Sequence, residues 1–424
     1  MDLRPGMRVA VFTNQFPGRL NTFFARDMRA LLEYGIELDI FAFYPSDERL
    51  WSNVPGLLDA TVLPRNRVHH VAPSAVVREA LPWPGRRTAT VLRDSMPIIA
   101  AAARYGPNAI AKAAYASAYA SASIRRFGSQ RFDHVLAYWG NHAASVAYLF
   151  HRITQPDIPF SMFVHARMDL YHQPAFLPEK MLYADNIFLV CEYNRTYLRQ
   201  HFPGVYERIA PRLIVHHLGL PLGDIAFHSG DRAGNRIVAV GNLEPLKGHA
   251  GLLRAMAAVR RRGTDLWLDL VGGGPEDSTL RKLADQLGLS DRVQFHGWCS
   301  EERVLALMRR ATVLVHPSVA PDAMPTVVKE ALAVGTPVIA SDLAGIPEML
   351  DDGRCGVLVP PGDILALGQA IADLVADPAR RQALAAAGRV HMEAGFDMWR
   401  NGRALADRLR TTVRAHREAH AGAS

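Results

Sequence analysis

Cysteine is scarce in this chain, which has three of them, Cys191, Cys299 and Cys355, among 424 residues. They lie far apart, and no His or further Cys stands at metal-ligand spacing from them, so neither a disulfide framework nor a zinc site is indicated. No apolar run approaches the ~18 residues of a membrane span. The first residues, MDLRPGMRVAVF, enter a strand pattern without the apolar core of a signal peptide. We therefore expect a reduced, cytoplasmic compartment.

Glycine is also sparse at the first turn between a strand and a helix. Residues 8–12 read as a buried strand, and Asn21 can cap a helix that Gly35 ends. A dinucleotide-binding fold would need Gly-x-Gly-x-x-Gly in the intervening loop, where only Gly18 is present. This absence counts against a nicotinamide or flavin enzyme.

The length predicts two domains of roughly 200 residues each. Strand and helix patterns alternate along the chain, which favours an α/β fold. A polar segment with three glycines, residues 223–234, separates the two series of elements. We therefore expect an N-terminal domain at 1–222, a linker at 223–234, a C-terminal domain at 235–395 and a final helix with a loose tail at 396–424.

Positive charge is concentrated in residues 81–131, which hold eight basic residues and one acid, a net +7. Such a surface beside apolar helix faces fits anionic lipid, and a merely solvated basic face is the alternative. The region lacks the interleaved aromatic and basic residues of single-strand binders, so we expect no nucleic-acid partner.

A strand, loop, helix and strand follow one another around residues 320–340, APDAMPTVVKEALAVGTPVIA. Pro325 suits the start of the helix, and Gly335 with Pro337 suits its end. Right-handed βαβ packing leaves the preceding loop, which contains Asp322, at the carboxyl edge of a parallel sheet, where open α/β sheets bind ligands. Glu330 follows on the helix. A turn-capping Asp and a solvated Glu are the alternative interpretation.

Residues 330–340, EALAVGTPVIA, closely resemble the second half of the signature of the family 4 glycosyltransferases, and Asp322 stands where that signature has its first Glu. The resemblance implies the GT-B fold, with two Rossmann-like domains facing across a cleft and a last helix that crosses back to the first domain. It also implies transfer of a sugar from a nucleoside diphosphate with retention of anomeric configuration. Asp322 would then lie against the donor sugar as a catalytic residue, and Glu330, with Thr326 beside it, would hold the donor's ribose side.

The loop at 241–248, GNLEPLKG, resembles the family's Gly-Arg-Leu-x-x-x-Lys-Gly segment, in which Arg and Lys grip the donor diphosphate. Lys247 fits this pattern, whereas Asn242 replaces the Arg. A neutral amide cannot offset the growing charge of the leaving group as a guanidinium does. A later segment that resembles Val-x-Phe-x-Gly implies that His296 lies near the nucleotide base.

In the first half, residues 14–35 resemble the first loop and helix of family 4 enzymes that build bacterial polysaccharides. The resemblance implies that Gly18 and Arg19 lie near the donor phosphates or the acceptor, and a tight turn is the alternative role for Gly18. The segment HARMDLY at 165–171 resembles the family's His-Ala/Gly-x-Asp segment with one extra residue. His165 is therefore a candidate catalytic residue, with a structural histidine as the alternative, and the altered spacing leaves the role of Asp169 open.

Metal-dependent glycosyltransferases of the GT-A type carry Asp-x-Asp, which does not occur in this sequence. We therefore expect no metal requirement and no cofactor, with a UDP- or GDP-linked sugar as co-substrate. The acceptor would be a saccharide or a lipid-linked molecule of bacterial surface or exopolysaccharide synthesis. Peripheral contact with the inner face of the cell membrane through residues 81–131 stays open.

Three rival functions remain. A nucleotide-sugar epimerase of the GT-B fold would act on the donor alone. A catalytically weak homologue that serves as a binding subunit is compatible with the altered positions Asn242 and Asp322. A phosphorylase would need a cofactor lysine site, which the sequence does not offer.

Overall fold

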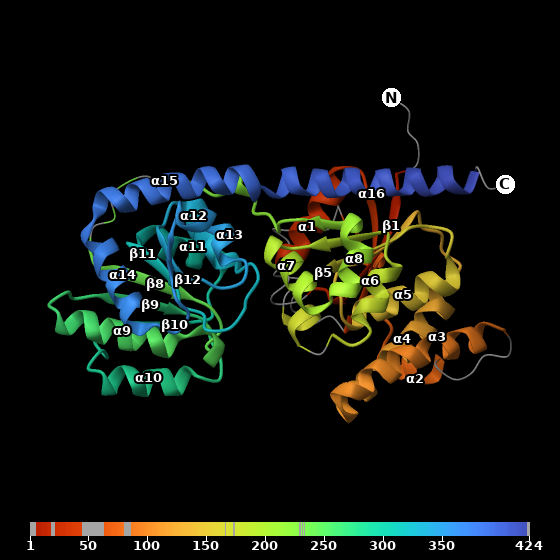
Figure 1. The fold of residues 1–424 in the computed structure, drawn as a ribbon, viewed down its shortest axis with the longest axis horizontal. Helices are drawn as coiled ribbons and strands as arrows, with labels where there is room; N and C mark the ends of the chain where they lie inside the picture. The colour runs from red at the N-terminus through yellow and green to blue at the C-terminus, as the bar shows by residue number, and fades with distance from the viewer. Residues whose placement is uncertain are drawn as a thin grey trace. The chain divides into compact units, whose positions relative to one another are not determined.

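A computed structural model describes residues 6–17, 22–44, 63–79, 86–165, 167–172, 174–228, 230, 232 and 234–421. The chain forms two compact units (Figure 1). Unit 1 comprises Met1–Gly219 together with Met398–Ser424, and unit 2 comprises Leu220–Asp397. The division therefore falls before residue 220 instead of after 222, and residues 223–234, expected as a linker, belong to unit 2.

Unit 1 is built on a sheet in which every strand pair is parallel, in the order β3-β2-β1-β4-β5-β6-β7. The described strands are β1 Arg8–Gln15, β2 Glu37–Tyr44, β3 Val68–His69, β4 His134–Ala137, β5 Phe160–Val164, β6 Asn186–Leu189 and β7 Leu213–Val215. The central strands are buried on both faces, as parallel sheets covered by helices require.

The helices of unit 1 come from both ends of the chain. They are α1 Thr22–Glu33, α2 Pro73–Glu79, α3 Arg86–Ala102, α4 Pro107–Phe127, α5 His142–Thr154, α6 Leu177–Tyr183, α7 Glu192–His201, α8 Pro203–Ile209 and α16 Met398–Ala421. The last of these packs beside α1, where Gly402 allows close approach to Ala30 (Figure 1). Asn401 of α16 also donates to the His217 carbonyl at 2.9 Å. The final helix thus returns to the first sheet.

Unit 2 holds a second parallel sheet, in the order β10-β9-β8-β11-β12-β13. The strands are β8 Arg236–Val240, β9 Trp267–Val271, β10 Val293–Gly297, β11 Val313–His316, β12 Val338–Ser341 and β13 Val357–Val359. The helices are α9 His249–Arg261, α10 Asp277–Gln286, α11 Glu301–Arg310, α12 Thr326–Val334, α13 Ile346–Met349, α14 Ile364–Ala376 and α15 Pro378–Gly395. Both sheets reverse their strand order once, between β1 and β4 and between β8 and β11.

The free energy of unfolding should fall in mild acid, because His134 on β4 is fully buried and neither ring nitrogen has a hydrogen-bond partner among the described residues. Burial lowers its pKa to about 3. Between pH 6.5 and 3, His134 is therefore protonated in the unfolded chain and neutral in the folded chain. The free energy of unfolding decreases as the pH falls below 6.5, by roughly 1.4 kcal/mol per pH unit for one such histidine.

Urea unfolding at pH 6.5, 5.5 and 4.5 measures this loss. His134→Leu should lose less stability over this range than the parent, whereas His201→Gln, at an exposed position of α7, should follow the parent. Parallel curves for His134→Leu and the parent would contradict the assignment.

Candidate functional site

The strand order of unit 2 brings two distant loops together. Ligands of open α/β sheets bind at the carboxyl edge where the order reverses, which here lies between β8 and β11. The loop after β8 carries Lys247, and the loop after β11 carries Asp322. The Lys247 ammonium forms an ion pair with the Asp322 carboxylate across 75 positions of sequence. Both side chains stay partly accessible, at 16% and 30% exposure, so a ligand can reach them.

Glycines let the loops of this edge pack backbone against backbone. Gly272 (φ +133°) lies so close to Gly241 that a Cβ would overlap the Gly241 carbonyl oxygen, and a Cβ on Gly248 (φ +72°) would overlap that of Pro317. Backbone hydrogen bonds join the same loops, from Leu243 N to Gly273 O at 3.1 Å and from Val319 N to Leu246 O at 2.8 Å. The Lys247 loop is therefore fixed by contacts that leave no room for a side chain.

Gly248→Ala is expected to destabilise unit 2 by about 3 kcal/mol, since the new Cβ would meet the Pro317 carbonyl and the left-handed φ disfavours alanine. Gly251→Ala is the matched control, because Gly251 lies inside α9 with open space around a Cβ. That control should be neutral or slightly stabilising. Thermal and urea unfolding of both variants measures the difference, and equal stability would contradict the tight packing of the loop.

Helix α12 presents Thr326 and Glu330 four residues apart, hence on the same flank. Gly335 occupies the left-handed C-cap (φ +81°), as the sequence predicts, whereas Pro325, expected at the first helical position, occupies the N-cap one residue earlier. Glu330 is 7% exposed, which is unusual for a carboxylate on a helix. The helix begins one residue after Pro325, in the chain segment that follows Asp322, so its N-terminal end lies at the carboxyl edge of the unit 2 sheet. The contact of Glu330 with a ligand at this edge stays a prediction.

Two further residues predicted to bind the sugar donor, Asn242 and His296, form hydrogen bonds with other side chains. The Asn242 amide donates to Glu244 Oε1 at 3.4 Å, a long hydrogen bond. His296 Nε2 donates to Asp269 Oδ1 at 2.7 Å, and Arg236 donates to both oxygens of that carboxylate at 2.8 and 2.9 Å. This network fixes His296 within the sheet. Its contact with a nucleotide base stays a prediction.

Two buried histidines that the sequence did not single out lie close to Lys247. Burial and, to a smaller extent, Lys247 lower the pKa of His316 to about 3. Burial likewise lowers the pKa of His249, the first residue of α9, to about 4. Both rings are therefore neutral at neutral pH, and positive charge at the edge comes from Lys247. The pattern His316-Pro317-Ser318 after a strand was the available signal, and the structure links His316 Nε2 to Ser318 Oγ at 3.0 Å.

His165 of unit 1 follows β5 at the carboxyl edge of the first sheet. It is 6% exposed, its Nε2 donates to the Tyr138 carbonyl at 2.9 Å, and its ring stacks on Trp139 at 4.3 Å between centroids. Burial lowers its pKa, and Asp169 opposes that shift. These contacts give His165 a structural role, and its catalytic role stays a prediction. Gly18 and Arg19 lie outside the described residues.

The basic region 81–131 forms α3 and α4 where it is described. Leu92 and Met96 stand one turn apart on α3 and are 59% and 61% exposed, with exposed Arg93 beside them. Arg93 and Arg152 both pair with Asp94.

In the described part of the chain, no helix has the length and hydropathy needed to cross a membrane. The same residues contain no group of three His, Cys, Asp or Glu side chains placed to hold a metal ion.

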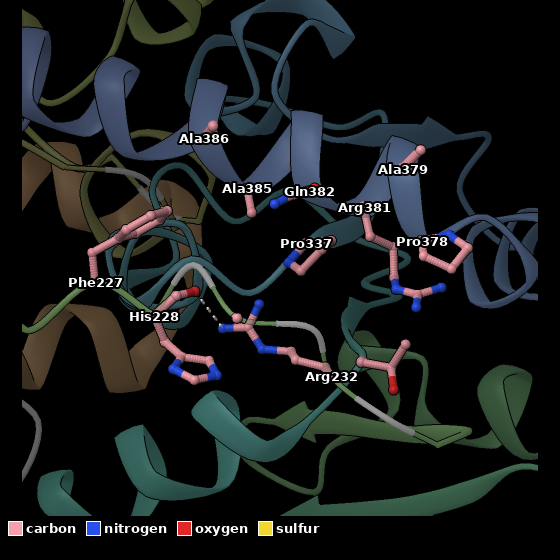
Figure 2. A pocket seen from close by; sticks show the side chains of 12 residues that line it. Phe227, His228, Arg232, Pro337, Pro378, Ala379, Arg381, Gln382, Ala385 and Ala386 are labelled. Carbon is pink, nitrogen blue, oxygen red and sulfur yellow. Dashed lines mark hydrogen bonds between the residues drawn. The ribbon is translucent and has the colours of Figure 1, made fainter.

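A hollow of about 450 Å³ lies at the amino edge of the unit 2 sheet, opposite the Lys247–Asp322 edge and beside Thr312 and Pro337 (Figure 2). Arg232 lines it and donates to the Val334 carbonyl at 3.2 Å and to the Gly335 carbonyl at the end of α12. Figure 2 also shows its bond to the His228 carbonyl. The segment expected as a linker thus caps a helix of unit 2, and this hollow is separate from the Lys247–Asp322 edge.

Two α/β units, each built on a parallel sheet, are the architecture expected of the GT-B class, and solved structures of similar fold agree with it. The Anabaena protein HepE in complex with UDP matches with a TM-score of 0.69 at 16% identity, over 96% of this chain and 100% of that one. Sucrose-phosphate synthase from Thermosynechococcus elongatus gives a TM-score of 0.71 at 20% identity over the same shares. The expected fold of each unit, a Rossmann-like domain on a parallel sheet, is confirmed.

The family described as "Glycosyl transferases group 1" matches residues 227–391, so the chain contains a group 1 glycosyltransferase domain, and the family resemblance is confirmed there. The GDP-mannose-dependent alpha-(1-6)-phosphatidylinositol monomannoside mannosyltransferase of Mycolicibacterium smegmatis is 36% identical over 41% of this chain and 47% of its own length. The D-inositol 3-phosphate glycosyltransferase of Streptomyces avermitilis is 36% identical over 42% and 40%. The match spans less than half of each of these relatives.

Proposed function

We propose that this protein transfers a hexosyl group from a nucleoside-diphosphate sugar to a saccharide or lipid-linked acceptor, with retention of anomeric configuration. The observation that carries this proposal is the meeting of Lys247 and Asp322 at the reversal point of the unit 2 sheet, inside the domain that matches the family. Sugar transfer needs a cation where the leaving diphosphate gains charge and acceptors that orient the sugar. These two side chains supply both.

Donor binding would exchange the partners of Lys247. A diphosphate that reaches the Lys247 ammonium replaces Asp322 as its counter-ion, and the released carboxylate can accept hydrogen bonds from sugar hydroxyls. The Glu330 carboxylate, on the helix that follows Asp322, would accept hydrogen bonds from the ribose hydroxyls. Asn242 contributes only a neutral hydrogen-bond donor. Lys247 would therefore have to stabilise more of the leaving group's negative charge than the corresponding Lys does in relatives with Arg at position 242.

No metal or cofactor is proposed, and the donor is UDP- or GDP-linked. A thermal-shift series with UDP, GDP and ADP, followed by turnover with the matching labelled nucleotide sugars and a saccharide acceptor panel, tests this function. We expect one nucleotide to stabilise the protein and its sugar to be transferred in the presence of chelator. Loss of activity under chelator that manganese restores would overturn the metal-independent mechanism.

The same turnover experiment separates the rivals. Conversion of donor without any acceptor would favour the epimerase. Nucleotide binding with intact donor after long incubation would favour a binding subunit.

We also propose that α3 contacts the anionic inner face of the cell membrane, in keeping with a cytoplasmic protein. The exposed apolar pair Leu92 and Met96 beside Arg93, in a region of net +7, supports this contact. Sedimentation with vesicles should show more binding to phosphatidylglycerol mixtures than to pure phosphatidylcholine. Leu92→Ser with Met96→Ser should lower that binding about tenfold. Val390→Ser, at an exposed apolar position of α15, is the control. Equal binding by the α3 variant and the parent would contradict the contact.

A further inference from the structure

A second hollow of unit 2, of about 690 Å³, lies where strands β8, β9 and β11 begin, opposite the Lys247–Asp322 edge. It adjoins the hollow of Figure 2, and His228 and Arg232 line both. Four of its lining residues are arginines, namely Arg232, Arg236, Arg309 and Arg310. Asp265 is the one acid among the described lining residues. We call this space the arginine hollow.

Ion pairs already neutralise part of the charge at the arginine hollow. Arg236 donates to both oxygens of Asp269 at 2.8 and 2.9 Å, and Arg292 donates to both oxygens of Asp265 at 2.9 and 3.0 Å. The Arg292 guanidinium lowers the pKa of Asp265, so this carboxylate is ionised and bound at neutral pH. Arg292, which does not line the hollow, therefore holds its one acid.

The other three arginines have no carboxylate partner among the described residues. Arg232 is 8% exposed and donates to backbone carbonyls, among them those of Arg309 and Val334 at 3.1 and 3.2 Å. The Nε of Arg309 is buried without a hydrogen-bond partner, and Arg310 is exposed at the end of α11. Burial and the neighbouring Arg381 lower the pKa of Arg232 to about 10, which leaves it charged at neutral pH.

Such an arrangement favours an anion. A buried cation and a buried N–H group each cost free energy until a partner meets them. The planar guanidinium pairs best with phosphate and carboxylate oxygens, often through two parallel hydrogen bonds. A volume of about 690 Å³ falls within the size of small-molecule sites, which are roughly 300–1,000 Å³. Three cations around one such space suit a ligand with more than one negative group.

We propose that the arginine hollow binds a soluble molecule that carries several phosphate groups. Arg309 and Arg310 donate to phosphate oxygens, and Arg232 contributes positive charge. This site is separate from the Lys247–Asp322 edge, and the inference does not depend on the proposed function. Because Arg232 also binds the last carbonyls of α12, the ligand would lie beside the end of the helix that carries Glu330.

The double variant Arg309→Gln with Arg310→Gln removes two of the three charges and keeps two good helix formers at the end of α11. Arg232 is left in place, because its hydrogen bonds hold the end of α12. Arg254→Gln is the matched control, since Arg254 is an exposed arginine on α9 of the same unit and does not line the hollow.

Isothermal titration with inorganic tripolyphosphate measures binding on the full chain. Lys247→Ala is present in every sample, so that the Lys247–Asp322 edge contributes little. We expect one site, at least about tenfold weaker binding of inorganic phosphate, and about 100-fold weaker tripolyphosphate binding in the double variant. Arg254→Gln should bind as the Lys247→Ala reference does. No tripolyphosphate binding by the reference, or equal binding by the double variant, would overturn the proposal.

Two further measurements keep the test decisive. If the double variant does not fold, the exposed substitution Arg310→Gln alone should weaken binding about tenfold, and an unchanged affinity would contradict the site. If Lys247→Ala does not fold, the number of tripolyphosphate sites on the parent should fall by one in the double variant, and an equal number would contradict it.

A lipid headgroup is the other source of phosphate, and sedimentation with vesicles of phosphatidic acid and phosphatidylcholine separates it from a soluble ligand. The double variant should sediment as the parent does. Loss of vesicle binding in the double variant, together with no tripolyphosphate binding by the parent, would assign the arginines to lipid and overturn the soluble ligand.

Discussion

Lys247→Ala is expected to lower the affinity for nucleoside diphosphate about 100-fold and kcat/KM about 1,000-fold. Charge-assisted hydrogen bonds contribute roughly 1.5–3 kcal/mol each, and one preorganised group at a developing charge contributes roughly 10²–10³ in rate. The neutral Asn242 and the neutral rings of His249 and His316 cannot replace this cation. Calorimetry with the nucleotide and with inorganic pyrophosphate should show both affinities falling, because the proposed contact of Lys247 is with phosphate and not with the base.

Lys282→Ala is the matched control, since Lys282 is an exposed lysine on α10 of the same unit. It should bind and turn over as the parent does. Sugar transfer at the parent's rate by Lys247→Ala would mean that the edge between β8 and β11 is not the donor site.

Glu330→Ala is expected to weaken nucleoside diphosphate about 100-fold and to leave pyrophosphate binding unchanged. The proposed contact of Glu330 is with ribose hydroxyls, which pyrophosphate lacks, and two hydrogen bonds to a carboxylate account for a loss of this size. Glu330→Gln keeps one acceptor oxygen and should fall between the parent and the alanine variant. Isothermal titration with both ligands gives the comparison directly.

Glu302→Ala, at an exposed position in the first turn of α11, serves as the control for the loss of one carboxylate. Thermal unfolding of each variant without ligand separates a folding defect from a binding defect, because Glu330 is buried. Equal weakening of nucleotide and pyrophosphate by Glu330→Ala would place this carboxylate at the phosphates instead of the ribose.

Residues that begin and end helices made much of the fold predictable from the sequence. The helix after Asp322 ends at Gly335 because glycine takes the left-handed cap at little cost. Short apolar runs gave the buried strands. The segment 223–234 misled, because its glycines and polar residues suggest a linker, whereas Arg232 packs it onto the end of α12.

The candidate site was predictable only in part. Residues 241–248 and 330–340 carry motif signals, so Lys247 and Glu330 could be named from the sequence. The ring stacking and the backbone hydrogen bond of His165 depend on neighbours far away in the chain, and so does the hydrogen bond between His296 and Asp269. No local pattern reports such contacts.

The sequence by itself determined the alternation of strands and helices and the C-terminal end of helix α12. It also determined which side chains are able to bind a phosphate or a hydroxyl group. These follow from backbone preferences and side-chain chemistry, which act over a few residues. Only the tertiary structure decided that Lys247 pairs with Asp322 and that the two buried histidines beside them are neutral. Those properties arise from strand order and burial, which bring distant residues together and remove them from water.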